Sequence, residues 1–248
     1  MFDLNNKTAL VTGGSRGIGR ATVLALANAG AHVIVHYNQA ADEANAVVDE
    51  IRTKGGKADA VRADLAQPGS PAKLAEEVKA IVGDKLDIVV ANAGIAGSAT
   101  IAEQTVADFD SYWAVNVRAP YFLVQQLLPL LYDGSSVVLI SSLAAISAVG
   151  DLSAYAATKG AEDTLVKYFA AALGAQGIRV NAVAPGVIDT DISNFTKTDE
   201  GRKAALSMQA LKRIGKPDDI ADVVAFLASS GARWITGTTV HVDGGSKL

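Results

Sequence analysis

Short apolar runs alternate with segments of helical periodicity along the whole chain of 248 residues. Several runs are almost continuously apolar and β-branched, as is typical of parallel strands buried on both faces. Between them, segments such as Ala44–Ile51 carry apolar residues at i, i+3, i+4 and i+7, the spacing of an amphipathic helix. Such β-α repeats predict an α/β fold: a doubly wound, seven-stranded parallel sheet with helices on both faces. The predicted strands are residues 7–11, 32–37, 58–63, 86–91, 136–141, 178–184 and 238–242.

The composition excludes several classes of function. Half of the residues are hydrophobic and none is cysteine, which rules out disulfides and cysteine-based metal sites or nucleophiles. The net charge is −4 and the basic residues are scattered, so we expect no nucleic-acid partner. No apolar run approaches the ~18 residues of a membrane span, and the first residues, with Asp3 among them, do not resemble a signal peptide. We therefore expect a cytoplasmic protein with no membrane partner.

One stretch interrupts the regular alternation. Residues 186–213 lie between the sixth predicted strand and the next helix, and this is long for such a connection. Insertions at the carboxyl edge of a sheet often cover the active site. No linker or repeat divides the chain, so we expect residues 1–248 to form one domain with a substrate lid at about 186–213.

The glycine-rich stretch VTGGSRGIG, at residues 11–19, fits two different catalytic signatures. Its G-x-S-x-G pattern would make Ser15 the nucleophile of a hydrolase, and its G-x-x-x-G-x-G pattern would hold the pyrophosphate of a dinucleotide. The hydrolase needs an oxyanion hole from an earlier loop and a histidine in a late loop. The stretch follows the first strand, and all three histidines fall in predicted strands. The dinucleotide interpretation is therefore favoured.

Tyr155 and Lys159 are spaced so that one face of a helix presents both side chains. A free tyrosine titrates near ~10, and a cation at ~4 Å favours its ionised form by up to roughly three pKa units. A tyrosine in that setting can act as a general acid or base. A solvated surface pair is the alternative for any isolated Y-x-x-x-K. Three further polar residues favour the catalytic interpretation. Asn92 and Ser142 lie at the ends of the fourth and fifth predicted strands, and Asn116 lies within a helical pattern.

These motifs together resemble the short-chain dehydrogenase/reductase family, in its branch of ~250 residues. The resemblance covers the chain in order: TGGSRGIG, ANAG, the asparagine of AVNV, ISS, YAATK, APGVIDT and GTTVHVDGG. Ala91 is the one departure noted, since many members have a second asparagine there. The resemblance implies a Rossmann fold and a hydride transfer between a nicotinamide cofactor and a carbonyl compound or secondary alcohol.

The resemblance also implies a role for each of four catalytic residues. Tyr155 would exchange a proton with the substrate oxygen, and Lys159 would lower the pKa of Tyr155 and hold the nicotinamide ribose. Ser142 would orient the carbonyl group, and Asn116 would anchor a water molecule. The implied cofactor contacts are Gly13, Ser15, Arg16, Gly17, Ile18, Gly19, Tyr37, Asn38, Asp64, Leu65, Asn92, Ala93, Gly94, Tyr155, Lys159, Pro185, Gly186, Ile188 and Thr190.

The second predicted strand indicates which dinucleotide is bound. In NAD-binding folds an acid at the end of this strand binds the ribose 2′-hydroxyl group and would repel a 2′-phosphate. The corresponding position holds Tyr37, and no acid occurs between Gly30 and Asp42. Arg16 could instead pair with a phosphate. His36 and Asn38 are candidates for further donors, although a histidine within a strand is more often structural. The sequence therefore favours NADP(H) over NAD(H).

The residues expected around the carbonyl group are small or apolar, which favours an uncharged substrate. Similar proteins include 3-oxoacyl-carrier-protein reductases, whose acidic partner needs a basic docking surface; residues 119–134 and 168–178 lack Lys and Arg. A non-catalytic dinucleotide sensor is a further alternative, disfavoured by the complete set of catalytic residues. The resemblance implies a homotetramer, and no metal is expected. The expected substrate contacts are Ile95, Ser142, Leu143, Val149, Tyr155, Phe195 and Met208.

Overall fold

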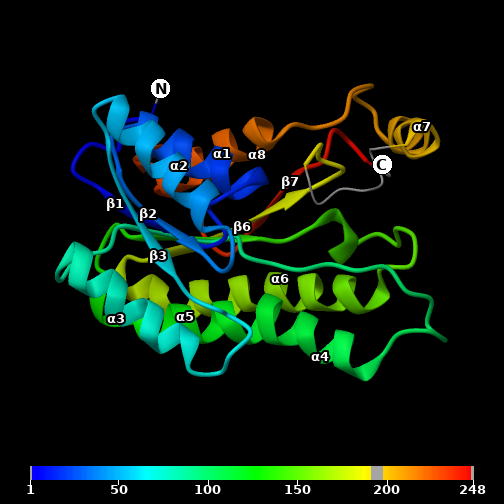
Figure 1. The fold of residues 1–248 in the computed structure, drawn as a ribbon, viewed down its shortest axis with the longest axis horizontal. Helices are drawn as coiled ribbons and strands as arrows, with labels where there is room; N and C mark the ends of the chain where they lie inside the picture. The colour runs from blue at the N-terminus through cyan, green and yellow to red at the C-terminus, as the bar shows by residue number, and fades with distance from the viewer. Residues whose placement is uncertain (1, 191–197, 247–248) are drawn as a thin grey trace.

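The computed structural model describes residues 2–190 and 198–246. Seven parallel strands form one sheet in the order β3-β2-β1-β4-β5-β6-β7 (Figure 1), which confirms the predicted fold. Each predicted strand is present, with its ends within two residues of the prediction. The strands are β1 (Thr8–Val11), β2 (His32–Tyr37), β3 (Lys57–Arg62), β4 (Ile88–Ala91), β5 (Ser136–Ile140), β6 (Arg179–Pro185) and β7 (Thr239–Val242).

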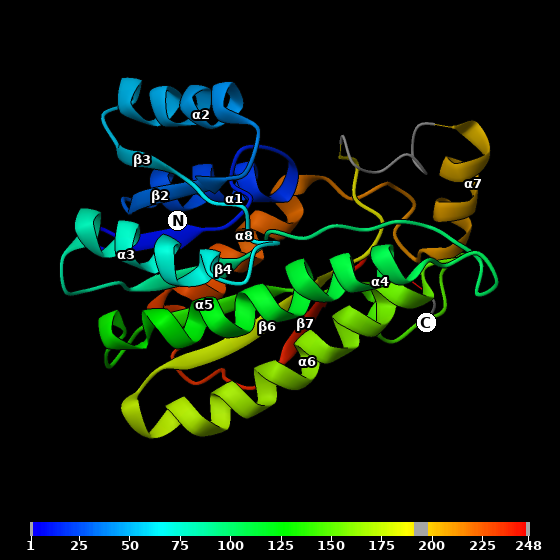
Figure 2. The same ribbon diagram turned by 60° about the horizontal axis from the view of Figure 1, so that its bottom comes forward.

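Helices cover both faces of this sheet (Figures 1 and 2). One layer contains α1 (Gly17–Asn28), α2 (Ala41–Thr53) and α8 (Pro217–Ala228). The other contains α3 (Ser70–Val82), α4 (Val106–Trp113), α5 (Ala119–Leu127) and α6 (Ser153–Leu173). A π-helical turn, η1 (Ala114–Arg118), joins α4 to α5, and α7 (Asp199–Met208) lies beyond the carboxyl ends of the strands.

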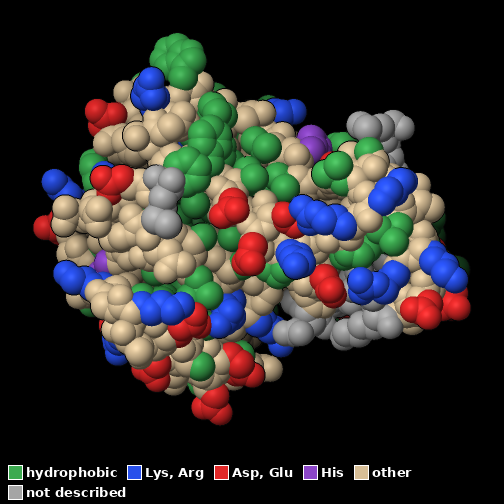
Figure 3. All heavy atoms as spheres, turned by 90° about the horizontal axis from the view of Figure 1, so that it is seen from above, with side chains coloured by type: hydrophobic (Ala, Val, Ile, Leu, Met, Phe, Trp, Pro, Cys, Tyr) green, Lys and Arg blue, Asp and Glu red, His purple; other side chains and the backbone are tan. Residues whose placement is uncertain are grey.

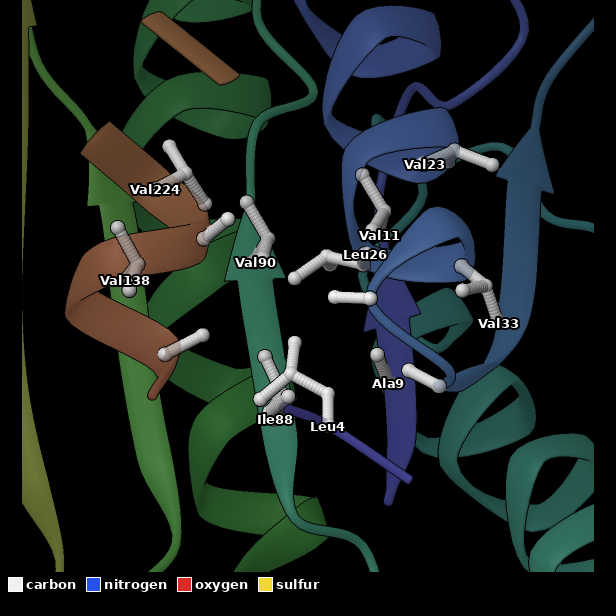
Figure 4. Close-up of a cluster of buried hydrophobic side chains, with 14 of the residues drawn as sticks. Leu4, Ala9, Val11, Val23, Leu26, Val33, Ile88, Val90, Val138 and Val224 are labelled. Carbon is white, nitrogen blue, oxygen red and sulfur yellow. The ribbon is translucent and has the colours of Figure 1, made fainter. Parts of the chain in front are cut away.

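Two hydrophobic clusters hold the layers together. In the first, Val11 and Val90 of the central strands face Leu26 of α1 on one side of the sheet (Figure 4). In the second, the neighbouring strand residues Leu10 and Val89 point to the opposite face, toward α3, α5 and α6. Successive side chains of a strand alternate between the faces, so a sheet covered on both sides needs apolar residues at every position. This explains the continuous apolar runs in the sequence.

The order of the strands determines where a ligand can bind. The chain starts inside the sheet at β1, continues outward to β2 and β3 on one side, and then returns to form β4 through β7 on the other. In open α/β sheets, ligands bind at the carboxyl ends of the strands on either side of such a reversal. The loops after β1, β4 and β5 therefore border the expected site.

The surface on the side of α1 and α8 carries interspersed basic and acidic side chains (Figure 3). Within residues 2–190 and 198–246, no helix is long and apolar enough to span a bilayer. The same residues contain no group of three or more His, Asp or Glu side chains suited to hold a metal ion.

Candidate active site

The glycine loop is built so tightly that larger residues would not fit. Gly13 and Gly17 have φ angles of 64° and 55°, which favour glycine. A Cβ atom on Gly19 would lie 2.0 Å from the carbonyl oxygen of Gly13. The side-chain amide of Asn92 donates to the carbonyl oxygens of Thr12 and Gly13, at 2.8 and 3.1 Å. The loop after β4 thus fixes the loop after β1.

His36, a candidate phosphate donor or structural residue in the sequence, contacts the same loop from β2, and this particular contact was not predicted. It is buried on β2, and its Nδ1 accepts a hydrogen bond from the Gly13 amide at 3.1 Å. Its Nε2 must then carry the hydrogen, which it donates to the carbonyl oxygen of Ala63 at 3.0 Å. Burial lowers the pKa of His36 to about 4. Both ring nitrogens are used within the protein, so His36 supports the loop and does not bind phosphate.

The first turn of α1 suits an anionic ligand. Arg16 occupies the N-cap position without a side-chain cap, and the first turn contains no acid. The amide groups of this turn and the helix dipole favour a phosphate at that position. Thr190 lies beside Gly17, since a Cβ atom there would be 3.7 Å from the Thr190 methyl group. Two of the predicted cofactor segments, residues 13–19 and 185–190, therefore meet.

Asn116 is fully buried in the π-helical turn η1. Its side chain accepts from the amide of Ile95 and donates to the carbonyl oxygen of the same residue, both at 2.9 Å. It also donates to the Thr158 hydroxyl group on α6, at 3.0 Å. Asn116 therefore joins the loop after β4 to the helix that carries Tyr155. It reaches Gly94 as well, where a Cβ atom would lie 3.4 Å from its Oδ1.

Tyr155 and Lys159 lie on one face of α6, as their spacing predicted. The Lys159 Nζ atom is 5.7 Å from the centroid of the Tyr155 ring. Lys159 is buried beside the loop after β4: a Cβ atom on Gly94 would lie 3.7 Å from its Nζ. Its ammonium group also contacts Glu162, which the sequence analysis did not single out. The i, i+3 spacing was visible in the sequence, but the burial of both residues was not.

Ser142 lies two residues beyond β5 and caps a short 3-10 turn, η3 (Leu143–Ala145). Its Oγ accepts a hydrogen bond from the Ala144 amide at 3.1 Å. Since the oxygen is the acceptor in this bond, the hydroxyl hydrogen can be donated to another group.

The residues predicted to contact the adenosine end of the cofactor lie at the ends of β2 and β3. Asn38 donates to the Asp64 carboxylate at 3.4 Å, and the Ala66 amide donates to the same oxygen at 3.1 Å. Arg62, which the sequence analysis did not name, pairs with Tyr37 in the register of β2 and β3. It donates to the carbonyl oxygen of Asn38 at 3.0 Å.

The predicted substrate contacts differ in exposure. Ile95 is 40% exposed and Val149 is half-buried, whereas Leu143 is buried, as is the predicted cofactor contact Ile188. Met208 is the last residue of α7 and is half-buried. Phe195 lies outside the described residues.

The structure thus joins a glycine loop at a helix N-terminus to a tyrosine–lysine pair at the carboxyl edge of a parallel sheet. This combination defines an oxidoreductase that binds a dinucleotide. Comparison with known proteins agrees: residues 13–247 match the family described as "Enoyl-(Acyl carrier protein) reductase".

Individual relatives are similar over nearly their whole length. Versicolorin reductase stcU of Emericella nidulans is 39% identical over 257 residues, covering 99% of this chain and 97% of the relative. The 3-oxoacyl-[acyl-carrier-protein] reductase FabG of Staphylococcus epidermidis is 38% identical over 242 residues, covering 97% and 98%. The angucycline C-6 ketoreductase LanV, solved with bound NADP, is 40% identical with a TM-score of 0.95, covering 100% and 98%.

This chain belongs to the short-chain dehydrogenase/reductase family. It is an NAD(P)-dependent reductase of that family.

Proposed function

We propose that this protein is an NADPH-dependent ketoreductase that acts on small, uncharged carbonyl compounds, with Tyr155 as the proton donor. The observation that carries the proposal is the Tyr155–Lys159 pair on α6, with the Lys159 Nζ 5.7 Å from the centroid of the tyrosine ring. The pair lies next to Gly94 and Asn116, at the switch point where such folds bind dinucleotides. The NADP bound to the LanV ketoreductase supports the choice of cofactor.

In this proposal each residue has one task. NADPH, when bound, supplies the hydride for the carbonyl carbon. Tyr155 donates its phenolic proton to the carbonyl oxygen, and the charge of Lys159 stabilises the phenolate that remains. Ser142 donates a hydrogen bond to the same oxygen and orients it. Asn116 keeps the loop at Ile95 against α6, which fixes the wall of the substrate site.

The glycine loop fits the pyrophosphate of the cofactor, because its small residues and the free amides of α1 allow close approach. The remaining predicted contacts, from Asn92 to Gly94 and from Pro185 to Thr190, would border the ribose and nicotinamide. The connection at about 186–213 would act as a lid over the substrate. Arg62 pairs with Tyr37 in the register of β2 and β3, and Arg16 lies in the glycine loop at the N-cap of α1; we assign both to the 2′-phosphate of NADPH.

Reduction of 3-oxoacyl chains on a carrier protein is a second candidate, favoured by the identity to FabG. Against it, α5 and the end of α6 at residues 168–173 lack the basic residues that would attract an acidic carrier. A homotetramer is also part of the proposal, since exposed aromatic residues gather on α4, α5 and α6.

The test is NADPH oxidation with a panel of free ketones, diketones and a 3-oxoester, beside a carrier-bound 3-oxoacyl substrate. Tyr155→Phe should reduce turnover by about 10²- to 10⁴-fold, the usual contribution of a positioned general acid. NADPH binding should be retained in this variant. Strong preference for the carrier-bound substrate would favour the second candidate, and full turnover in Tyr155→Phe would contradict both.

A further inference from the structure

Glu162 lies one turn after Lys159 on α6 and is 2% exposed. Its two carboxylate oxygens accept hydrogen bonds from the Lys159 Nζ atom at 2.9 and 3.0 Å. The same Nζ donates to the carbonyl oxygen of Ile140, on β5, at 2.8 Å. An ammonium group has three hydrogens, so these three oxygens can engage all of them. Lys159 is therefore held on the side of the protein interior.

Charged and polar groups from α6, β5 and β7 surround this pair. On α6, the other titratable groups that act on it are Tyr155 and Asp163. β5 contributes the Ile140 carbonyl group, and β7 contributes Thr239, which donates to the Asp163 carboxylate at 2.9 Å. Burial raises the pKa of Glu162 to about 7. Burial lowers the pKa of Lys159, but the charges of Glu162 and Tyr155 outweigh this and raise it.

We propose that Glu162 is a positioning residue that acts on the reaction through Lys159, by holding the ammonium group and offsetting its charge. The proposal rests on the proposed function, because it takes Tyr155 as the proton donor. An ionised Glu162 adds negative charge beside the Tyr155–Lys159 pair, so the pair retains its protons to a higher pH than it would alone. Reduction needs the protonated tyrosine. Glu162 therefore extends the active range toward alkaline pH.

The sign of the effect can be checked with two variants. Glu162→Gln removes the charge and keeps an oxygen that can accept from Lys159, and Glu162→Leu removes both. In each, the alkaline limb of the reductive kcat profile should shift to lower pH by about one unit, as expected for one buried, partly screened charge. Asp163→Asn is the matched control, because Asp163 is the adjacent carboxyl group and bonds Thr239 instead of Lys159. Its shift should be less than half as large.

A measurement that does not need turnover separates this proposal from the proposed function. The phenolate of Tyr155 can be followed by ultraviolet absorbance, as the difference between each protein and its Tyr155→Phe counterpart. The midpoint should move to lower pH in both Glu162 variants, with NADPH binding confirming that each is folded. Unmoved midpoints, or an equal shift in Asp163→Asn, would overturn the role of Glu162. A shifted midpoint in a protein that reduces no carbonyl compound would support that role and contradict the proposed function.

Discussion

At the scale of single residues, Arg16 is the residue that we propose selects between the two dinucleotides. It is exposed at the N-cap of α1, and the end of β2 carries Tyr37 where NAD-binding folds have an acid. A charge-assisted bond to a phosphate contributes about 1.5–3 kcal/mol. We therefore predict that Arg16→Ala weakens NADPH binding by about 10- to 100-fold and NADH binding by less than about threefold, measured by titration of nucleotide fluorescence.

Arg20 provides the matched control for that measurement. It lies one turn further along α1, and its guanidinium group pairs with Glu50 at 2.6 Å. Arg20→Ala removes the same charge from the same helix, and it should leave the ratio of the two affinities unchanged. Equal losses of NADPH and NADH binding in Arg16→Ala would contradict the assignment of Arg16 to the 2′-phosphate.

The sequence identified residues whose role depends on local spacing and missed those whose role depends on burial. Tyr155 and Lys159 could be paired because four residues make about one helical turn. Glu162 and His36 look like ordinary helix and strand residues in the sequence. Tertiary packing buries Glu162 beside Lys159 and brings His36 beside Gly13. Spacing along one element reveals neither the burial of its residues nor their contacts with another element.

At the scale of the elements, β2 supports the turn between β1 and α1 through His36. The folded-state pKa of His36 is about 4, against 6.5 for a free histidine. The unfolded chain therefore binds the proton more readily, and folding stability falls as the pH decreases from about 6.5 toward 4. Between pH 7 and pH 5 this single group should remove about 2 kcal/mol of stability.

The contribution can be isolated with His36→Asn, whose amide retains one donor and one acceptor. Urea denaturation at pH 7 and pH 5 should show a smaller loss of stability in this variant than in the wild type. His241→Asn, which removes an exposed histidine on β7, serves as the comparison and should behave as the wild type does. If His36→Asn loses as much folding stability between pH 7 and pH 5 as the wild type does, the proton affinity of His36 does not differ between the folded and unfolded chains.

The pattern of elements was predictable, but some of their ends and irregular turns were not. Alternating apolar runs located all seven strands, because a sheet covered on both faces requires them. The fifth strand ends at Ile140, one residue early, where the chain turns to place Ser142 at the cap of η3. The π-helical turn around Asn116 could not be predicted, since its side chain bonds a distant loop and α6.

At the scale of the whole molecule, the outer face of α4, α5 and α6, which points away from the sheet, carries exposed aromatic residues. Phe109, Tyr121 and Phe122 are each about 40% exposed, and Tyr168 is 72% exposed. Tyr121 packs against Phe169 of α6 in a tilted arrangement, with ring centroids 5.4 Å apart. Figure 2 shows α4 and α5 in line with each other and α6 beside them, on the face opposite α1 and α8. Contiguous exposed aromatic residues of this kind are typical of contacts between protein chains.

We predict that this face pairs two copies of the chain within a homotetramer. A charged group buried without a partner costs several kcal/mol, so Tyr121→Glu should convert the tetramer to dimers at micromolar concentration. Sedimentation velocity measures the change. Ile81→Glu, at an exposed apolar position near the end of α3, places the same charge outside the face and should leave the tetramer intact. A monomeric wild type, or a tetramer that survives Tyr121→Glu, would show that these aromatic residues do not form the interface.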